Sequence, residues 1–435
     1  LIKEYNKMDK NYARRIDSCR SCGSTELVDV LSLGDLYVTN FVNSEEEQGP
    51  KIPLELTLCN FEKGCGLLQL RHTTSSNLMW GDQYWYKSGI NSMIRADLKD
   101  IVEKSKRILP VKAGDVVIDI GCNDGTMLEY YNVPGLNLVG FEPSKNVAAE
   151  AQAKGINVIH DFFNEKAYSS NVEKKKSKII TAISMFYDLD KPNDFVEDVI
   201  RCLDDNGLFV IQQNYLATML RNNAIDNICH EHLEYYSHNS LENLLNRHGF
   251  ETFDVELNEI NGGSIRNYIR FRGSKIPQSD AAKKRLNNLL QFEKESGLNN
   301  IETYHAFTKR ISSIKKELMD FLGKEKKNGK TICALGASTR GNTMLQYFGL
   351  TPHLIDCIFD KNPDKEGKRA VGSLIPVTSP SNIGKYNPDY QLVLICHIFK
   401  GVGEDEKRFT ENGGKFILPL PEIKIIGDKS REIGN

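Results

Sequence analysis

The sequence lacks any long apolar run. None of its hydrophobic stretches approaches the length of about eighteen residues that an α-helix needs to cross a membrane. The first seven residues, Leu1 to Lys7, are mostly polar or charged and lack the apolar core of a signal peptide. We therefore expect a cytoplasmic protein with no membrane partner.

The chain also lacks an excess of charge of either sign. Its 56 lysine and arginine residues nearly balance 58 aspartate and glutamate residues, so the net charge is −2. Such a chain has no overall field that attracts nucleic acid, and we expect a small-molecule partner instead. The 435 residues are 40% apolar and 26% charged, as in a globular protein of two or three domains. The oligomeric state stays open, and a monomer is compatible with these numbers.

Disulfides are not expected in a reducing compartment, so clustered cysteines indicate metal ligands. Four of the ten cysteines cluster near the N-terminus, as Cys19-x2-Cys22 and Cys59-x5-Cys65. Two such pairs are typical of a structural zinc site, in which thiolates hold a segment too small for its own core. The second spacing is longer than usual, so a set of free reduced cysteines is the alternative. Four sulfur ligands would leave zinc no open position for catalysis.

Residues 116–128, Val-Val-Ile-Asp-Ile-Gly-Cys-Asn-Asp-Gly-Thr-Met-Leu, predict a strand that runs into a glycine turn and then a helix. Gly121 and Gly125 let backbone amides approach a ligand, and the next strand ends in Glu142, whose carboxylate can bind both ribose hydroxyls of a nucleoside. The turn lacks the G-x-G-x-x-G pattern that seats a pyrophosphate, and an acidic residue between its glycines would repel phosphate. Asp119-x-Gly121-x3-Gly125 is instead similar to motif I of Rossmann-like methyltransferases.

We therefore predict S-adenosylmethionine as the cofactor, with a turn whose glycines serve packing alone as the alternative. Met185 and Phe186 follow the fourth predicted strand, where this fold lines its donor pocket, although Phe186 is equally a candidate for the core. The predicted cofactor-binding residues are Asp119, Gly121, Asn123, Gly125, Glu142, Pro143, Met185 and Phe186.

Apolar segments alternate with helical patterns through the middle of the chain. We predict strands at residues 115–120, 137–141, 156–160, 178–184 and 207–213, preceded by a helix within 84–112. An antiparallel hairpin is expected from Phe250 to Phe271. Residues 279–327 show helical spacing, and a second strand, glycine turn and helix begin at Thr331, with further strands at 355–360 and 391–396.

The predicted fold is therefore α/β, with two Rossmann-like units. The predicted parts are a zinc-binding N-terminal module (1–83), a Rossmann-like S-adenosylmethionine methyltransferase core (84–272), a helical linker (273–327) and a smaller Rossmann-like C-terminal domain (328–435).

The glycine turn at residues 336–343 lacks the lysine of a P-loop. Asn342 stands at the lysine position of G-x-x-x-x-G-K-[ST], so nucleotide hydrolysis is not expected. The turn can still hold a phosphate at a helix N-terminus, and a nucleoside diphosphate attached to the substrate would fit. The candidate substrate ligands are Ser338, Thr339, Arg340, Asn342 and Asp360. A purely structural turn, with Asp360 as a cap, is the alternative.

The densest polar segment is Asn227–Ser237, which follows a predicted strand whose end faces the ligand cleft. His230 and His232 offer a base that titrates near neutrality, and Glu231 offers a carboxylate that orients it or raises its pKa. A metal site of two histidines and a carboxylate is one alternative, and a polar helix cap is another. We take a general base as the first choice.

Two further segments are candidates for contact with ligand. Tyr86 precedes the cofactor core and could close over the methyl donor, with packing as the alternative. The hairpin segment Asn261–Arg266 combines small residues with a fixed cation where backbone could approach a ligand.

Taken in order, these motifs resemble those of the three-part sugar C-methyltransferases of deoxysugar pathways, which act on nucleotide-linked 4-keto sugars. The four cysteines are similar to the zinc module of that family, Asp119 to Gly125 to its S-adenosylmethionine loop, and Glu231-His232 to its catalytic pair. The resemblance extends over residues 17–420. Two positions depart: Cys229 stands where members tend to carry tyrosine, and Asn261 where they tend to carry histidine.

The resemblance implies S-adenosylmethionine-dependent C-methylation of a nucleotide-linked 4-keto-deoxy sugar. A 4-ketone acidifies neighbouring C–H groups, so His232 would remove a proton as general base while Glu231 orients or balances the imidazole. Tyr86 and nearby polar groups would stabilise the oxyanion. An O- or N-methyltransferase, in which the same cluster deprotonates a hydroxyl or amine, is one alternative. A non-catalytic protein that binds S-adenosylmethionine is another, and the near-neutral charge disfavours a zinc-linked RNA methyltransferase.

Overall fold

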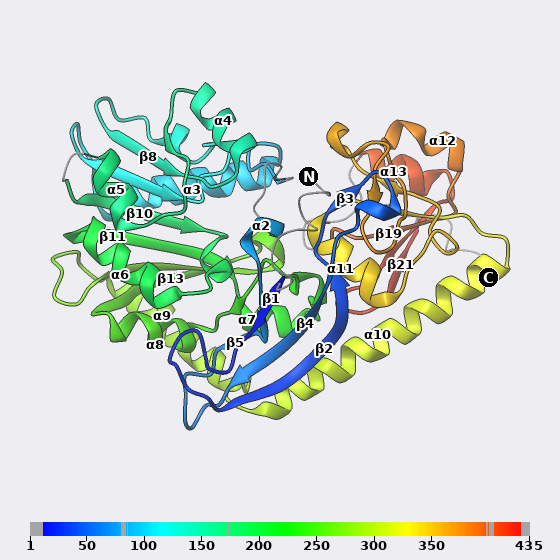
Figure 1. Cartoon of the computed structure of the whole chain (residues 1–435), viewed down its shortest axis with the longest axis horizontal. Helices are drawn as coiled ribbons and strands as arrows, with labels where there is room; N and C mark the ends of the chain where they lie inside the picture. The colour runs from blue at the N-terminus through cyan, green and yellow to red at the C-terminus, as the bar shows by residue number, and fades with distance from the viewer. Residues whose placement is uncertain are drawn as a thin grey trace.

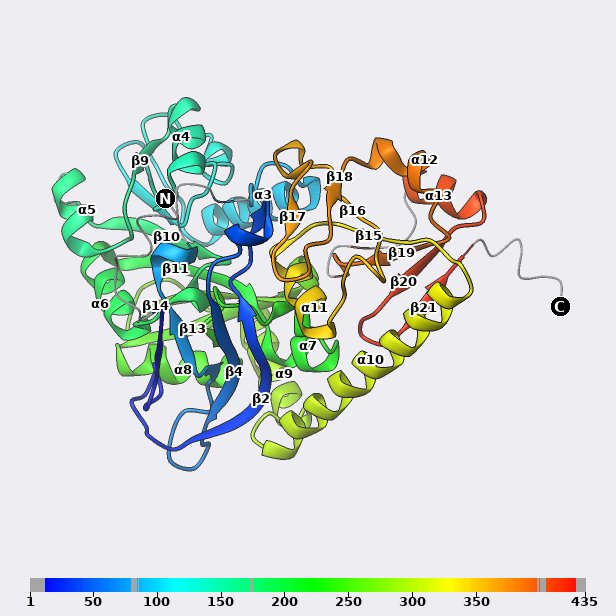
Figure 2. The same ribbon diagram turned by 45° about the vertical axis from the view of Figure 1, so that its right-hand side comes forward.

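The structure is a computed structural model that describes residues 12–79, 84, 86–172, 175–396, 399 and 404–427. Two α/β lobes lie side by side, and the long helix α10 (Ile301–Lys327) runs along the lower edge of the C-terminal lobe (Figure 1). In both views the N-terminal strands extend between the lobes (Figure 2). Within the described ranges, no helix is both long and apolar enough to span a membrane.

A seven-stranded sheet forms the larger lobe, in the order β13-β14-β11-β10-β7-β8-β9. Its strands are β7 (Val116–Ile120), β8 (Asn137–Phe141), β9 (Asn157–Ile159), β10 (Ser177–Ile183), β11 (Leu203–Asn214), β13 (Phe250–Asn258) and β14 (Ser264–Phe271). The first five run parallel, and the last two form an antiparallel hairpin at the edge. The predicted strands and hairpin are present, which confirms the Rossmann-like core.

Helices pack on both faces of this sheet because its strands are apolar on both sides. In β10, for example, Ile179 joins one hydrophobic cluster and Ile180 the other. The helices of this lobe are α3 (Ser92–Ile108), α4 (Lys145–Ala153), α5 (Glu165–Asn171), α6 (Pro192–Cys202), α7 (Leu216–Arg221), α8 (His238–Arg247) and α9 (Asp280–Glu295). Residues of α3 and α4 belong to one cluster, and residues of α5, α6 and α8 to the other.

Helix α3 shows how sequence sets the position of an element beside the site. The side chain of Asn91 accepts a hydrogen bond from the backbone N–H of Met93 and caps the helix. The buried residues Ile94, Leu98 and Ile101 follow helical spacing and pack on the sheet. The helix is shorter than the predicted range because residues 88–90 form a turn before this cap.

The turn after β7 differs from the prediction of a helix. It leads only to a short 3-10 helix, Leu128–Tyr130. Pro134 has no backbone N–H and disfavours helical geometry in the residue before it, so a helix here could not extend to residue 133. Gly135 then turns the chain with φ +79° into β8.

The N-terminal strands are shared with both lobes. The sheet order is β12-β5-β4-β2, in which β12 comes from the larger lobe and pairs with β5. Strand β3 pairs with β17 of the C-terminal lobe. The strands are β1 (Ala13–Arg15), β2 (Leu27–Tyr37), β3 (Phe41–Val42), β4 (Lys51–Cys59), β5 (Leu68–Leu70), β6 (His72–Thr74), β12 (Glu234–Tyr235) and β17 (Arg369–Ala370).

The C-terminal lobe contains a six-stranded sheet in the order β18-β16-β15-β19-β20-β21. Only β21 is antiparallel to its neighbour. The elements are β15 (Ile332–Leu335), β16 (Ile358–Phe359), β18 (Val377–Thr378), β19 (Tyr390–Val393), β20 (Lys415–Leu418), β21 (Lys424–Ile426), α11 (Thr339–Phe348), α12 (Ile383–Tyr386) and α13 (Glu404–Glu411). This sheet confirms the second, smaller α/β unit.

The division into four parts remains a proposal. The proposed boundary between residues 83 and 84 falls where only Tyr84 is described between Met79 and Tyr86, so it lies outside the described residues. Beyond it, one hydrophobic cluster joins the N-terminal sheet, helix α10 and the C-terminal sheet, for example through Leu56, Phe307 and Ile332.

Candidate active site

A cavity lies at the carboxyl ends of the parallel strands in the larger lobe. The strand order reverses between β7 and β10, and such a switch point is where open α/β sheets bind ligands. The lining includes several predicted site residues: Tyr86, Asp119, Gly121, Asn123, Glu142, Pro143 and Met185. The sequence pattern thus brings together the end of β7, the end of β8 and the turn after β10.

Glu142 is held rigidly at the end of β8. Its carboxylate accepts hydrogen bonds from the backbone N–H groups of Asn123 (3.1 Å) and Ser144 (2.7 Å). Burial raises its pKa. A carboxylate fixed in this way keeps lone pairs directed to a ligand, as the pairing with ribose hydroxyls requires.

Asn123 connects the glycine turn to the segment above it. Its backbone has φ +53°, and its side chain accepts from Ser88 N–H at 2.9 Å and donates to the carbonyl of Tyr86 at 3.1 Å. Tyr86 is thereby tied to the turn while 44% of its surface stays exposed. The tyrosine therefore stands at the mouth of the cavity.

Asp119 and Gly121 form the floor beneath the turn. Thr181 donates a hydrogen bond of 2.8 Å to Asp119, and burial raises the pKa of this carboxyl group to about 7. A Cβ on Gly121 would come within 3.1 Å of Met185 Cγ, so a side chain there would crowd the cavity.

The cavity lining does not include two of the predicted cofactor residues. A Cβ on Gly125 would lie 2.3 Å from Ile156 Cδ1 and 3.0 Å from Ala151 Cβ, so this glycine allows the turn to pack on α4. Phe186 is fully buried between Phe195 and Tyr236 in the core. Their predicted contact with cofactor stays a prediction.

His232 lies in the loop that follows α7 and is held in one tautomer. Its Nδ1–H donates to the carbonyl of Asn227 at 2.8 Å, which leaves Nε2 as the acceptor. The ring packs edge-on against Tyr187 with centroids 4.5 Å apart. Burial lowers its pKa to about 4, so the imidazole is neutral at neutral pH.

Glu231 lies beside this imidazole. Possible ligand atoms of Cys229, Glu231 and His232 all lie within 4.8 Å of one another. Burial raises the pKa of Glu231 to about 7, which is suited to proton transfer near neutrality. The sequence predicted that Glu231 orients the His232 ring. In the structure the Asn227 carbonyl, not Glu231, accepts the hydrogen bond from Nδ1.

His230 points away from this pair. Its Nε2 makes a 3.0 Å hydrogen bond with the carbonyl of Ile52 in the N-terminal sheet, and burial lowers its pKa to about 4. It therefore holds the loop against β4. Among the described residues, the two groups able to ligate a metal are the four cysteines and the Cys229, Glu231 and His232 cluster, so His230 joins neither.

Arg340 extends from α11 of the C-terminal lobe to the segment before Glu231 and His232. Its Nη2 lies 2.7 Å from Asp226 Oδ2, and Nη1 donates to the carbonyl of Asn261 at 2.7 Å. Both partners of the ion pair are nearly inaccessible, with 10% and 2% of the side chains exposed. A fixed positive charge therefore lies between the two lobes, close to His232.

The other residues of the second glycine turn have partners within the protein. Ser338 caps α11 by accepting from Gly341 N–H, and Asn342 donates to the carbonyl of Asn40 at 3.0 Å. Asp360 accepts from Ala337 N–H at 2.7 Å. Thr339 is the first residue of α11 and is partly exposed. Their contact with substrate phosphate stays a prediction.

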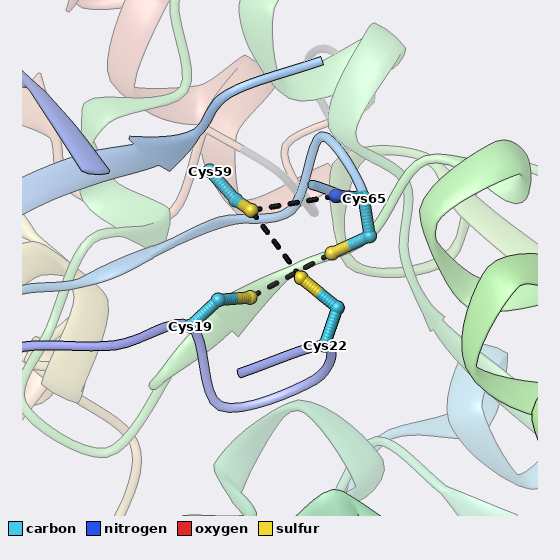
Figure 3. Close-up of side chains that lie close together, drawn as sticks. All are labelled: Cys19, Cys22, Cys59 and Cys65. Carbon is cyan, nitrogen blue, oxygen red and sulfur yellow. Dashed lines mark hydrogen bonds between the residues drawn. The ribbon is translucent and has the colours of Figure 1, made fainter. Parts of the chain in front are cut away.

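The four predicted zinc ligands converge from two loops (Figure 3). The distance between sulfur atoms is 3.6 Å for Cys19 and Cys65 and 3.5 Å for Cys22 and Cys59, and all four atoms lie within 4.8 Å of one another. Tetrahedral zinc with Zn–S bonds of about 2.3 Å separates its sulfurs by about 3.8 Å, so the set fits zinc. Gly23, with φ +75°, follows the second cysteine of the first pair and permits the tight loop.

Sequence reasoning missed several lining residues. Asp97 lines the cavity from α3, and its position on the apolar face of that helix was a signal that could have found it. Tyr84 also lines the cavity, and its pKa is raised by burial and by nearby Glu231. Asp226 gave no signal, because its partner Arg340 is distant in sequence.

Three family profiles match consecutive parts of the chain. They describe a zinc binding domain (residues 19–80), a methyltransferase domain (92–255) and a C-methyltransferase C-terminal domain (259–421). Among curated proteins, the C-methyltransferase NovU of Streptomyces niveus is 28% identical over 425 residues, which are 97% of this chain and 99% of NovU.

Solved structures also align with part of the chain. The plantazolicin methyltransferase BpumL in complex with SAH is 16% identical with a TM-score of 0.33, and the alignment covers 40% of this chain and 82% of BpumL. An S-adenosylmethionine-dependent methyltransferase from Clostridium acetobutylicum ATCC 824 is 16% identical with a TM-score of 0.32, over 41% of this chain and 94% of that one. Likeness at these scores adds no argument to the family matches.

Proposed function

We propose that this S-adenosylmethionine-dependent methyltransferase, whose three parts match the domain profiles of C-methyltransferases, methylates a carbon of a nucleotide-linked 4-keto-deoxy sugar. The observation that carries this proposal is the neighbouring pair of Glu231 and His232: Glu231 lies near Asp188 of the cavity lining, and Arg340 lies near His232. An unprotonated imidazole, a carboxyl group that titrates near neutrality and a fixed cation suit the removal of a proton from carbon next to a ketone.

The cofactor is proposed to lie in the cavity at the switch point. Glu142 would bind the ribose hydroxyls, and the backbone at Gly121 and Asn123 would approach the methionine half. Asp119, Pro143 and Met185 would complete the lining, with Gly125 and Phe186 acting through packing. S-adenosylmethionine supplies an electrophilic methyl group, which the nucleophilic carbon of the acceptor receives.

His232 is proposed as the general base. Its Nε2 is free of the Asn227 bond and would accept the proton from the acceptor carbon. The resulting imidazolium would be stabilised by ionised Glu231 and by Asp226, because both carboxylates lie nearby. His230 would act indirectly by fixing the loop on β4.

The enolate oxygen would be stabilised at the other side of the acceptor. Tyr86 stands at the cavity mouth, and Arg340 holds a positive charge beside the catalytic loop. The helix N-terminus at Ser338 and Thr339 would receive the diphosphate, and Asn342 and Asp360 would hold the turn in shape. The zinc ion held by the four cysteines is structural, because its four ligands are all supplied by the protein.

Solvent exchange tests the enolate step separately from methyl transfer. The zinc-loaded protein would be incubated in D2O with nucleotide-4-keto-6-deoxy sugars and SAH, which cannot donate a methyl group. We expect deuterium at the carbon next to the ketone by NMR, and loss of this exchange in His232→Ala. A protein that binds the sugar without any exchange would contradict the enolate step and favour the alternative of O-methylation.

A further inference from the structure

The cofactor cavity extends well beyond the proposed ribose contact. Its lining follows the strand order from the residues after β9, through Glu142 after β8 and the turn after β10, to Gln212 in β11. Asp97 of α3 lines the cavity on the β11 side. A nucleoside bound at Glu142 would therefore direct its remaining half across β7 and β10 toward Asp97.

The carboxylate of Asp97 is fixed by two buried partners. Arg266 donates from Nη2 to Oδ1 at 2.8 Å, and Gln212 donates from Nε2 to Oδ2 at 2.6 Å. The Asp97 side chain is 8% exposed and the Arg266 side chain 2% exposed. Each carboxylate oxygen has two acceptor sites, so one site on each oxygen remains open toward the cavity.

The charges around Asp97 do not balance. Arg266 also pairs with Asp100 at 2.8 Å and with Glu256 at 3.3 Å, and Lys104 lies 2.9 Å from both of these carboxylates. Among the described residues, this network therefore holds three carboxylates against two cations. Of these three carboxylates only Asp97 lines the cavity, where the neighbouring residues Ile94, Leu98 and Ile260 are apolar.

A buried carboxylate that shares its arginine with two other carboxylates and keeps an acceptor site on each oxygen favours a cationic ligand group. The methionine half of S-adenosylmethionine carries an α-ammonium group several bonds from the ribose. We propose that Asp97 binds this ammonium group, with Arg266 and Gln212 as positioning residues that aim its carboxylate. The inference rests on the proposed placement of the cofactor in this cavity.

The other lining carboxylates are less suited to this role. Glu142 at the end of β8 and Asp161 after β9 lie on the nucleoside side of the cavity, and Asp119 accepts from Thr181 on the floor. Asp188 lies near Glu231, so it belongs to the acceptor side. Asp97 is therefore the lining carboxylate on the β11 side of the cavity, where the ammonium group is expected.

Calorimetric binding to the zinc-loaded full chain tests the proposal with two ligands. SAH carries the ammonium group, whereas 5′-methylthioadenosine contains the nucleoside without the amino acid. We expect Asp97→Asn to weaken SAH binding by about ten- to a hundredfold while it leaves methylthioadenosine affinity within about twofold. Retained methylthioadenosine binding also shows that the variant is folded.

Two matched variants separate the possible failures. Asp100→Asn removes a carboxylate that pairs with the same arginine from the same helix but does not line the cavity, so SAH affinity should stay within about twofold. Glu142→Gln should weaken both ligands. If Glu142→Gln affects neither ligand, the cofactor placement is wrong. Suppose that Glu142→Gln weakens the binding of both ligands, but Asp97→Asn weakens the binding of neither ligand or of both equally. The proposed role of Asp97 is then wrong. If Asp97→Asn only raises the KM for the sugar, Asp97 binds the acceptor instead.

Discussion

At the residue scale, burial sets the acid–base character of Glu231 and His232. The pKa of Glu231 is raised to about 7 and that of His232 is lowered to about 4, because burial disfavours the charged form of each. At neutral pH the His232 imidazole is therefore neutral, and the Glu231 carboxyl group beside it is partly ionised. A proton taken up by His232 is stabilised once Glu231 has ionised.

The activity should therefore rise with pH through the titration of Glu231. Since this carboxyl group is protonated below its pKa of about 7 and ionised above it, we expect kcat/KM to increase from about pH 6 to about pH 8. Glu231→Gln should remove this ascending limb and lower the rate about ten- to a hundredfold. A pH–rate profile measured on both proteins checks the assignment, and an unchanged limb in the variant would refute it.

Arg266 should be far more important for stability than an exposed arginine with similar bonds. Its removal leaves the buried Asp97 carboxylate unpaired, so Arg266→Met should reduce the free energy of unfolding by about 3 to 5 kcal/mol. Arg285 makes a bidentate pair with Asp254 but is 41% exposed, so Arg285→Met should cost about 1 kcal/mol or less. Denaturant unfolding of both variants measures the difference, and equal losses would contradict it.

At the element scale, the sequence predicted the strands of the larger sheet but not the long strands β2 and β4 of the N-terminal sheet. The predicted strand at 137–141 coincides with β8, and the turn at Asn261 does separate β13 from β14. Strand β12 has two residues in a polar segment, so it has no periodicity to detect and exists through its pairing with β5. Short strands such as β18 escaped prediction for the same reason.

The direction of side chains at the site was less predictable than the backbone. Arg266 was predicted only as a fixed cation in the hairpin, and it is buried against Asp97 because partners come from α3. Arg340 was expected in a phosphate turn, and it pairs with Asp226 of the other lobe. The local sequence pattern predicts which helix or strand carries such a residue. The direction of its charged group depends on partners that are distant in sequence.

The zinc loops should depend on all four cysteines. Cys22→Ser replaces one sulfur of the converging set and should abolish stoichiometric zinc, because the remaining three thiolates leave the tetrahedron open. Cys396→Ser lies outside the set and should retain one zinc per chain. Elemental analysis after gel filtration distinguishes these results, and a full equivalent of zinc in Cys22→Ser would argue against the assignment.

At the scale of the whole molecule, the N-terminal sheet joins the two lobes. Strand β12 of the larger lobe extends it at one edge, and β3 pairs with β17 of the C-terminal lobe. The side chain of Gln346 in α11 also bonds both the N–H and the carbonyl of Tyr37 in β2. The N-terminal sheet thus contacts both the larger lobe, which carries Glu231 and His232, and helix α11, which carries Arg340.

This architecture predicts that loss of zinc lowers the thermal stability of both lobes. Arg247 and Asn193 of the larger lobe donate to the carbonyl of Ser21 between the first two cysteines, so a loosened zinc loop loses these contacts. We expect one cooperative thermal transition with zinc and a lower Tm after chelation. Calorimetric scans with and without a chelator measure this, and an unchanged Tm would show that the zinc loop is independent of the lobes.

The central claim is methylation at carbon, and it is tested most directly by the position of the transferred group. The protein would be supplied with S-adenosylmethionine labelled with carbon-13 in the methyl group and with a nucleotide-4-keto-6-deoxy sugar. We predict a product whose labelled methyl carbon is coupled to a ring carbon in the NMR spectrum, and no such product from His232→Ala. A labelled methyl group attached to oxygen or nitrogen would contradict the account.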